Sequence, residues 1–260
     1  MENRIFNCIS TIDYFEVDVY NDLGIGVEIQ DFTEPSLLDH GWEKRVDEYK
    51  AILEGFSNPI SLHGPFLDLK PASPDNAIRE VTMNRYLTTL NIGSKLNVDY
   101  IVFHSQINPW INEPRMRRLN NNMQKRFWEE LLSVEDCSQR TIVIENIFEY
   151  DPLFLKELID TLDMPNFKVC LDVGHARLSK DIDYWVKVLK DKIEYMHIHW
   201  NGGLYDEHLR PADENIKYIA KILKKYNMCP NLALEYDVND VESEVERIRK
   251  ILSFVDVEEI

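Results

Sequence analysis

The sequence has 260 residues, of which 44% are hydrophobic, and its 46 Asp and Glu against 29 Lys and Arg give a formal net charge of −17. This length and composition suit one large domain and exclude the disordered and fibrous classes. The net charge repels polyanions, so bulk affinity for nucleic acid is disfavoured unless a local basic patch offsets it.

Cysteine spacing predicts a reducing compartment, and hydropathy predicts that no segment spans a membrane. The four cysteines show no C-x-x-C spacing and are interpreted as small buried hydrophobic residues; they are Cys8, Cys137, Cys170 and Cys229. MENRIFNCIS at the N-terminus has no apolar segment of signal-peptide length, and no run reaches the roughly 18 to 20 apolar residues that span a bilayer. We therefore expect a cytoplasmic protein without membrane contact. The sequence does not distinguish a monomer from an oligomer.

Apolar runs and helical periodicities alternate through eight rounds along the chain. The predicted strands are 4–10, 24–32, 60–63, 100–104, 141–145, 167–172, 193–199 and 232–235. The predicted helices are one within 11–24, and then 36–56, 73–96, 115–137, 151–164, 181–190, 216–227 and 241–254. Local signals mark several ends: Gly24 closes the first helix, and Ser73 caps the third, with Pro74 in its first turn.

Strict alternation of strand and helix predicts a parallel sheet, and eight units in this length predict closure into a single (β/α)8 TIM barrel. One domain would then comprise residues 1–260. An open, doubly wound sheet is the alternative. It is disfavoured because ISTIDYF, after the first strand, contains no glycine-rich turn that could hold a phosphate.

Six predicted strands end on, or are closely followed by, a side chain able to bind a metal. Because the C-terminal ends of parallel strands meet at one rim, these side chains should converge there. The candidates are His63, His104, Glu145, Asp172, His175, His197, His199, Asp206, His208 and Glu235. A set rich in histidine suits zinc, whereas manganese or iron is favoured where carboxylates dominate.

Each candidate also has a structural interpretation. A single histidine at a strand end, such as His63 or His104, is more often a hydrogen-bonded structural residue than a ligand. Asp172 could simply cap the following helix. The joint occurrence outweighs these alternatives, because every histidine except His40 falls at a strand end or in one following loop. Convergent buried carboxylates and imidazoles require a neutralising partner such as a metal.

His197 and His199 lie two residues apart and face the same side of their strand. The resemblance described below favours His197 as the ligand and leaves open whether His199 reaches the site. Four further residues are candidates for substrate contact: Phe66, Trp110, Trp200 and Arg210. The aromatic side chains could stack on a sugar ring or pack under a loop, and the arginine could bind an anionic substrate, remain solvated or contact a helix cap. The basic residues of 115–126 could equally form a solvated helix face.

The motifs HGPF, VFHS, IEN, LDVGH, MHIHW, DEH and LEYD, in this order, resemble the xylose-isomerase-like TIM-barrel superfamily and, within it, the endonuclease IV branch, AP endonuclease family 2. This resemblance implies three zinc ions held by nine side chains. His63 and His104 would bind the first ion; Glu145 would bridge it to a second, completed by Asp172, His197 and Glu235; and His175, Asp206 and His208 would hold the third.

The chain departs from that branch where the branch contacts DNA. PADENI replaces a glycine-rich segment after the last histidine of the motif set, and Phe66 stands where the branch has a tyrosine that inserts into DNA. The loop after the second strand has no convincing match for the branch's inserting arginine, and HWNGG lacks the usual acidic and basic pair. Together with the net charge, these departures disfavour duplex DNA as the substrate.

Two enzymatic hypotheses follow. The first is a phosphoester hydrolase with two or three Zn²⁺ ions, or Mn²⁺ or another divalent metal, acting on a small phosphorylated or sugar-derived molecule. The second is a sugar or sugar phosphate isomerase or epimerase with one divalent metal, in which Glu145 and Glu235 transfer a proton while His175 and Arg210 hold the substrate. A non-catalytic binding barrel is a third alternative, disfavoured by the number of ionisable groups desolvated together.

Overall fold

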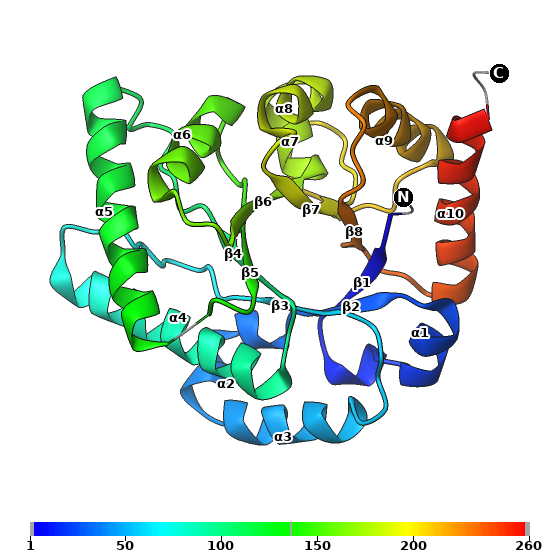
Figure 1. The fold of residues 1–260 in the computed structure, drawn as a ribbon, viewed down its shortest axis with the longest axis horizontal. Coiled ribbons are helices and arrows are strands. Elements are labelled where there is room, and N and C mark those ends of the chain that lie inside the picture. Colours follow the sequence, from blue (N-terminus) through cyan, green and yellow to red (C-terminus); the bar gives the residue numbers. More distant parts are fainter. Residues whose placement is uncertain (1–2, 136, 258–260) are drawn as a thin grey trace.

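The computed structural model describes residues 3–135 and 137–257. Eight parallel strands form a closed barrel in the order β1 to β8, and helices surround it (Figure 1). The strands are β1 (Ile5–Ile9), β2 (Gly26–Ile29), β3 (Ile60–His63), β4 (Tyr100–His104), β5 (Thr141–Glu145), β6 (Phe167–Asp172), β7 (Ile193–Ile198) and β8 (Asn231–Leu234). The predicted (β/α)8 TIM barrel is confirmed.

The helices follow the strands as the sequence predicts, with three differences. They are α1 (Val17–Leu23), α2 (Pro35–Asp39), α3 (Trp42–Ile52), α4 (Asn76–Leu96), α5 (Pro114–Val134), α6 (Pro152–Leu162), α7 (Val173–Ser179), α8 (Ile182–Leu189), α9 (Asp213–Lys225) and α10 (Val241–Val257). The helix predicted at 36–56 is broken, because Gly41 has φ +104° between α2 and α3. Asp75, not Ser73, caps α4, and its side chain accepts from the amide of Ala77. Helix α7 was not predicted.

The barrel interior contains an apolar layer directly beneath the polar rim. Its buried side chains are Phe6, Val102, Val143, Cys170, Tyr195 and Ala233. Because side chains two residues apart on a strand share a face, the next inward-facing residue on each of five strands is polar; these residues are His104, Glu145, Asp172, His197 and Glu235. The alternation of side chains along the strands therefore places the candidate ligands directly above a buried, largely apolar layer.

All four cysteines are free. Cys137 and Cys170 are buried as expected, Cys8 is partly buried, and the expectation of burial is wrong for Cys229, which is exposed. Among the described residues, we find no helix both long enough and apolar enough to cross a membrane.

Candidate metal centre at the C-terminal mouth of the barrel

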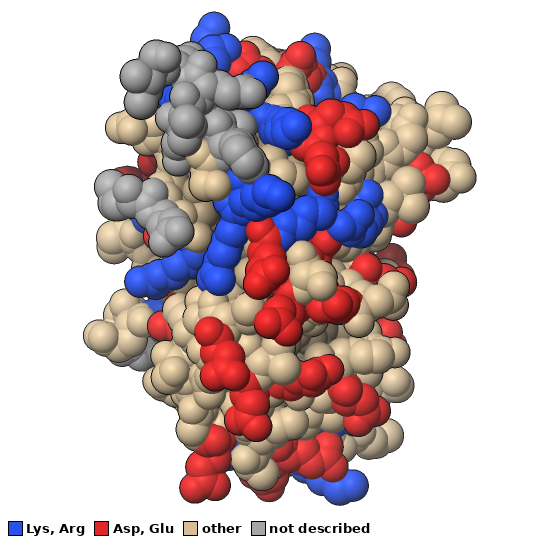
Figure 2. Space-filling model, turned by 90° about the vertical axis from the view of Figure 1, so that its right-hand side faces the viewer, with Lys and Arg blue, Asp and Glu red and all other residues tan. Residues whose placement is uncertain are grey.

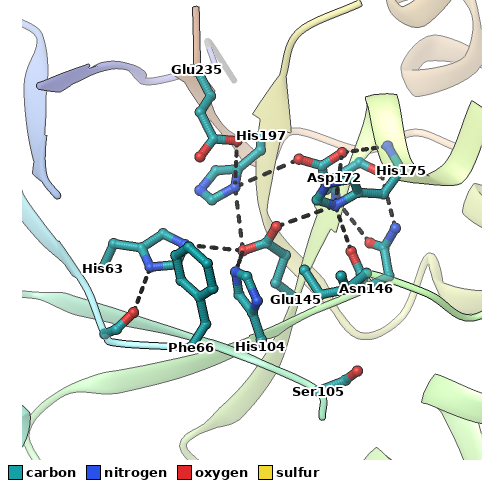
Figure 3. Close-up of polar contacts among 12 residues, drawn as sticks. His63, Phe66, His104, Ser105, Glu145, Asn146, Asp172, His175, His197 and Glu235 are labelled. Atoms are coloured by element: carbon teal, nitrogen blue, oxygen red, sulfur yellow. Dashed lines mark hydrogen bonds and ion pairs between the residues drawn. The ribbon is translucent and has the colours of Figure 1, made fainter. Parts of the chain in front are cut away.

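Glu145, at the end of β5, is the centre of the site (Figure 3). Its side chain is buried, and its Oε2 lies 3.2 Å from His63 Nε2 and 3.5 Å from both His104 Nε2 and His197 Nδ1. Its Oε1 lies 3.5 Å from His175 Nδ1. One carboxylate therefore contacts imidazoles from four different strands or strand-following segments.

The nine predicted ligands are all brought together at this mouth. Among the described residues, donor atoms form five overlapping groups, with the atoms of each group within 4.8 Å of one another. Three of these groups together contain all nine: His63, His104 and Glu145; Glu145, Asp172, His197 and Glu235; and His175, His199, Asp206 and His208. The other two are Glu28, His63, His197 and Glu235, and Glu145, Cys170 and His197. The first two groups share Glu145, as the resemblance to endonuclease IV implies.

Three imidazoles have one ring nitrogen fixed by a backbone carbonyl. Since a carbonyl oxygen only accepts, that nitrogen carries a proton, and the other nitrogen presents a lone pair whenever the ring is neutral. The fixed contacts are His63 Nδ1 to Gly64 O at 2.8 Å, His175 Nδ1 to Asn146 O at 2.9 Å, and His208 Nδ1 to Glu235 O at 3.1 Å. The free nitrogens face carboxylates instead: His63 Nε2 faces Glu145, and both His175 Nε2 and His208 Nε2 face Asp206 Oδ2, at 3.2 and 2.8 Å.

Glu28 is a site residue that was not predicted from the sequence. It is fully buried on β2, and its carboxylate lies 3.1 Å from His197 Nε2 and also accepts from Gln30 Nε2 and Ser61 Oγ. Burial raises the pKa of Glu28, but His197 and the amide of Gln30 outweigh this and lower it to about 2. A charged residue inside the apolar run GVEI was the available signal.

The remaining nitrogen of His197 fits a metal ligand. His197 Nδ1 lies 3.1 Å from Glu235 Oε2, and among the described residues neither atom has a hydrogen-bond partner. Nε2–H donates to Glu28, so Nδ1 is the nitrogen left to face Glu235. In the metal-free protein, burial lowers the pKa of His197, but the surrounding carboxylates outweigh this and raise it well above its ordinary value, so the ring carries a second proton. A metal ion would replace that proton, and the imidazole and carboxylate donors suit Zn²⁺ or Mn²⁺.

Electrostatics keep the carboxylates ionised. Burial raises the pKa of Glu145, but His104 and His197 outweigh it and hold this pKa well below its ordinary value. In the metal-free protein, burial lowers the pKa of His175 but Asp172 and Asp206 raise it to about 12. Burial lowers the pKa of His104 to about 3, so this ring is neutral at pH 7. Protons on some imidazoles thus occupy the place that a metal cation would take.

His199 does reach the site, in addition to His197. Its Nε2 lies 2.9 Å from Asp172 Oδ2, and its ring stacks on His208 with centroids 4.0 Å apart. Gly174 of the LDVGH motif makes room for this ring, because a Cβ at Gly174 would lie 2.0 Å from His199 Cε1. The third group is therefore larger than the resemblance implied.

Asn146, in the IEN motif, joins the ends of β5 and β6. Its Nδ2 donates to the carbonyl of Asp172 at 3.1 Å, and its Oδ1 accepts from the amide of Asp172 at 2.8 Å. Its backbone carbonyl also accepts a hydrogen bond from His175 Nδ1. Asn146 therefore fixes the positions of Asp172 and His175 relative to each other. The IEN motif is visible in the sequence, but this role of Asn146 depends on contacts with β6 and His175.

The four predicted substrate contacts lie in different environments. Phe66 stacks on His104, with ring centroids 4.3 Å apart and planes at 15°, and so borders the site. Trp110 is 88% exposed on the loop after β4. The ring of Trp200 lies under the guanidinium of Arg177, and Arg210 donates to Glu244 on α10 rather than toward the three ligand groups.

Comparison with protein families decides the wider relationship. The model of the xylose isomerase-like TIM barrel family matches residues 17–255. The chain belongs to this family. An uncharacterized protein of Methanocaldococcus jannaschii is 28% identical over 208 residues, which are 77% of this chain and 80% of that protein. A second uncharacterized protein of the same archaeon is 23% identical over 271 residues, 95% of this chain and 96% of that protein.

Solved structures share the fold of this xylose isomerase-like barrel. A D-tagatose 3-epimerase-like protein superposes with a TM-score of 0.77 at 18% identity, covering 98% of this chain and 99% of that one. A Thermus thermophilus protein soaked with ZnCl2 has a TM-score of 0.75 at 22% identity, with the same coverage. D-psicose 3-epimerase from Clostridium cellulolyticum has a TM-score of 0.66 at 16% identity, with 98% of each chain covered.

Proposed function

We propose that this xylose isomerase-like barrel is a metal-dependent phosphoester hydrolase that acts on a small phosphorylated or sugar-derived molecule. The observation that carries the proposal is the sharing of Glu145 between two groups of ligand-type side chains, with a third group adjacent. An isomerase needs only the second group. His63 and His104 would then be desolvated beside Glu145 without a catalytic role, which is costly for ionisable groups.

Bound metal ions would supply Lewis-acid stabilisation of the phosphoryl oxygens and a water of lowered pKa as nucleophile. The side chains of the site would bind and orient these ions. Glu145, Glu235 and Asp172 provide the negative charge. The three imidazoles held by backbone carbonyls and His197, held by Glu28, would present their other nitrogen in a defined direction. The apolar layer beneath them excludes water from below, and Phe66 covers His104 at the side.

The acidic surface favours a small substrate over a nucleic acid duplex. A net charge of −17 repels a polyanion over a wide surface, whereas a small phosphate ester can be attracted by the local charge of the ions alone.

Metal content and phosphate release together test the proposal. Protein purified without chelator should carry two or three zinc or manganese ions per chain by plasma mass spectrometry. It should release phosphate from some member of a panel of sugar phosphates and nucleotides, or cleave the strand of abasic DNA, with the small esters preferred. The E145Q variant should lose turnover by at least about a hundredfold, while E246Q, at an exposed position of α10, should not. A single ion that soaking does not increase, together with no phosphate release, would contradict it.

A sugar epimerase or isomerase is the second candidate, because one group resembles a complete single-metal site. Glu145 and Glu235 both face His197 Nδ1, at 3.5 and 3.1 Å, so two carboxylates border the position where a substrate carbon would lie. Several proteins of the same fold are named as sugar epimerases. Deuterium exchange at a sugar carbon in D2O, observed by NMR without phosphate release, would favour this activity.

A further inference from the structure

Gln30, the residue after β2, connects two carboxylates from different sides of the site. Its Nε2 lies 3.1 Å from Glu28 Oε1 and 2.9 Å from Glu235 Oε1. Glu28 is on β2 and Glu235 directly follows β8, and β1 lies between these two strands. At this level β1 contributes the small thiol of Cys8, 3.6 Å from Glu28 Oε1. The longer side chain of Gln30 therefore joins two strands that are not neighbours in the barrel.

The chemistry of its two partners determines how the amide of Gln30 is oriented. An ionised carboxylate only accepts hydrogen bonds, whereas an amide nitrogen carries two hydrogens and an amide oxygen carries none. Only Nε2 can therefore contact Glu28 and Glu235 together, with one hydrogen for each. The backbone holds Gln30 in place for these contacts, because its amide donates to Ile9 O at 3.0 Å and its carbonyl accepts from Thr33 Oγ1 at 2.8 Å.

The donor of Gln30 separates two like charges. Among the described residues no Lys or Arg forms an ion pair with Glu28 or Glu235, whose ion-pair partners are histidines. Figure 2 shows the side of the molecule with α10 and α1: Asp and Glu gather on its lower half, at the level where α10 begins, and Lys and Arg on its upper half. Because like charges at this distance repel, Glu235 would turn away from Glu28 without the amide.

The contact with Gln30 leaves one oxygen of Glu235 free. Oε1 accepts from Gln30, whereas Oε2 points to His197 Nδ1 at 3.1 Å and has no hydrogen-bond partner among the described residues (Figure 3). Glu28, the other partner of Gln30, accepts from His197 Nε2. Gln30 thus holds both members of the pair formed by His197 and Glu235, one directly and the other through Glu28.

We propose that Gln30 is a positioning residue of the candidate metal centre, which turns Glu235 so that Oε2, and not Oε1, faces the ion held with His197. The proposal rests on the proposed function only for the presence of a metal ion. Residues that hold a ligand by a hydrogen bond commonly change metal affinity by about ten- to a hundredfold, so the effect is measurable without a substrate.

Zinc binding to Q30M tests the proposal, because methionine keeps the length of the side chain and removes both donors. The chelator-treated protein is titrated with zinc in competition with a fluorescent chelator. One ion per chain should bind about ten- to a hundredfold more weakly, and any other ion should keep its affinity. Q139M, at an exposed position before β5, is the matched control and should bind as the unsubstituted protein does. Unchanged affinity for every ion in Q30M overturns the proposal.

A second variant covers the case in which Q30M does not fold, as judged by circular dichroism. Q30N keeps the amide but is one methylene shorter, so it cannot reach Glu28 and Glu235 together. It should weaken the same single ion, and an unchanged affinity in a folded Q30N also overturns the proposal.

A double-mutant cycle separates positioning from a general effect on packing. If Gln30 acts through Glu235, adding Q30M to E235Q should weaken zinc binding by less than about threefold beyond E235Q alone, because the carboxylate to be oriented is gone. A further loss as large as that in the unsubstituted background overturns the proposal. Since zinc is the only probe, a weakened ion in Q30M without phosphate release from any ester supports the role of Gln30 and contradicts the hydrolase.

Discussion

The imidazole of His197 on β7 lies with its Nε2 3.1 Å from the carboxylate of Glu28 on β2. These strands are not neighbours in the barrel, so the contact crosses its interior. Because the pKa of Glu28 is held at about 2, the carboxylate is ionised and accepts the Nε2 proton. Glu28 thereby determines which nitrogen of His197 is available to a metal.

Replacing Glu28 by glutamine should weaken metal binding by about ten- to a hundredfold, because an amide can donate to Nε2 and favour the wrong tautomer. Competition of the metal-loaded protein with a fluorescent chelator measures the change. E246Q serves as a control for loss of one charge. Unaltered affinity in E28Q would show that the Glu28 contact does not orient the imidazole.

Substituting Gly174 by alanine should destabilise the protein by about 1–3 kcal/mol, as overpacking does, because the added methyl group would occupy the space of the His199 ring. Urea unfolding of the metal-free protein measures this. G202A is the matched control, since a Cβ there would meet only the flexible side chain of Glu207. If both variants unfold at the same urea concentration, His199 is not packed against Gly174 as described.

Glu244 should make stability depend on pH in the acidic range. Burial raises its pKa, but hydrogen bonds from Arg247, Arg210 and Tyr236 outweigh this and lower it to about 2. A depressed folded-state pKa contributes stability that is complete above the unfolded value near 4.5 and is lost as the pH falls toward 2. E244Q should therefore cost about 2–3 kcal/mol at pH 7 and progressively less below pH 4.5.

Urea titrations between pH 7 and pH 3 test this dependence. E246Q, on the same helix, is the control and should follow the unsubstituted protein. A constant difference between E244Q and the unsubstituted protein over this range would show that the pKa of Glu244 is not depressed.

Zinc should raise the melting temperature of the chelator-treated protein, because the ionised carboxylates of the site then gain a cation that the unfolded chain binds less well. At a free zinc concentration of about 100 Kd the expected gain is roughly 2.7 kcal/mol per site. Differential scanning calorimetry measures it. E145Q should lose much of the shift, because Glu145 belongs to three of the five groups of ligand-type residues. No shift with zinc or manganese would contradict a metal centre.

Much of the fold and of the site follows from local patterns. Eight alternations of strand and helix predicted the barrel, and strands β3, β4, β5 and β6 have the predicted bounds. The ten candidate residues could be predicted because each lies at a strand end or in the segment that follows it, where parallel strands converge. The choice of nine of them as ligands came from the resemblance to endonuclease IV. The predicted helix ends were less accurate. Gly41 breaks one predicted helix through its backbone conformation, and Asp75 caps α4, a role that neighbouring residues such as Ser73 could also have filled.

The sequence by itself determined which side chains reach the rim, because alternation along a strand assigns each residue to the interior or the exterior. Only the tertiary structure decided which of them face one another. Glu28 meets His197 across the closed barrel, His199 joins the third group because Gly174 leaves room for it, and Arg210 turns to Glu244 on the last helix. These contacts depend on strand tilt, barrel closure and loop direction, which bring together residues far apart in the chain and leave no local pattern in the sequence.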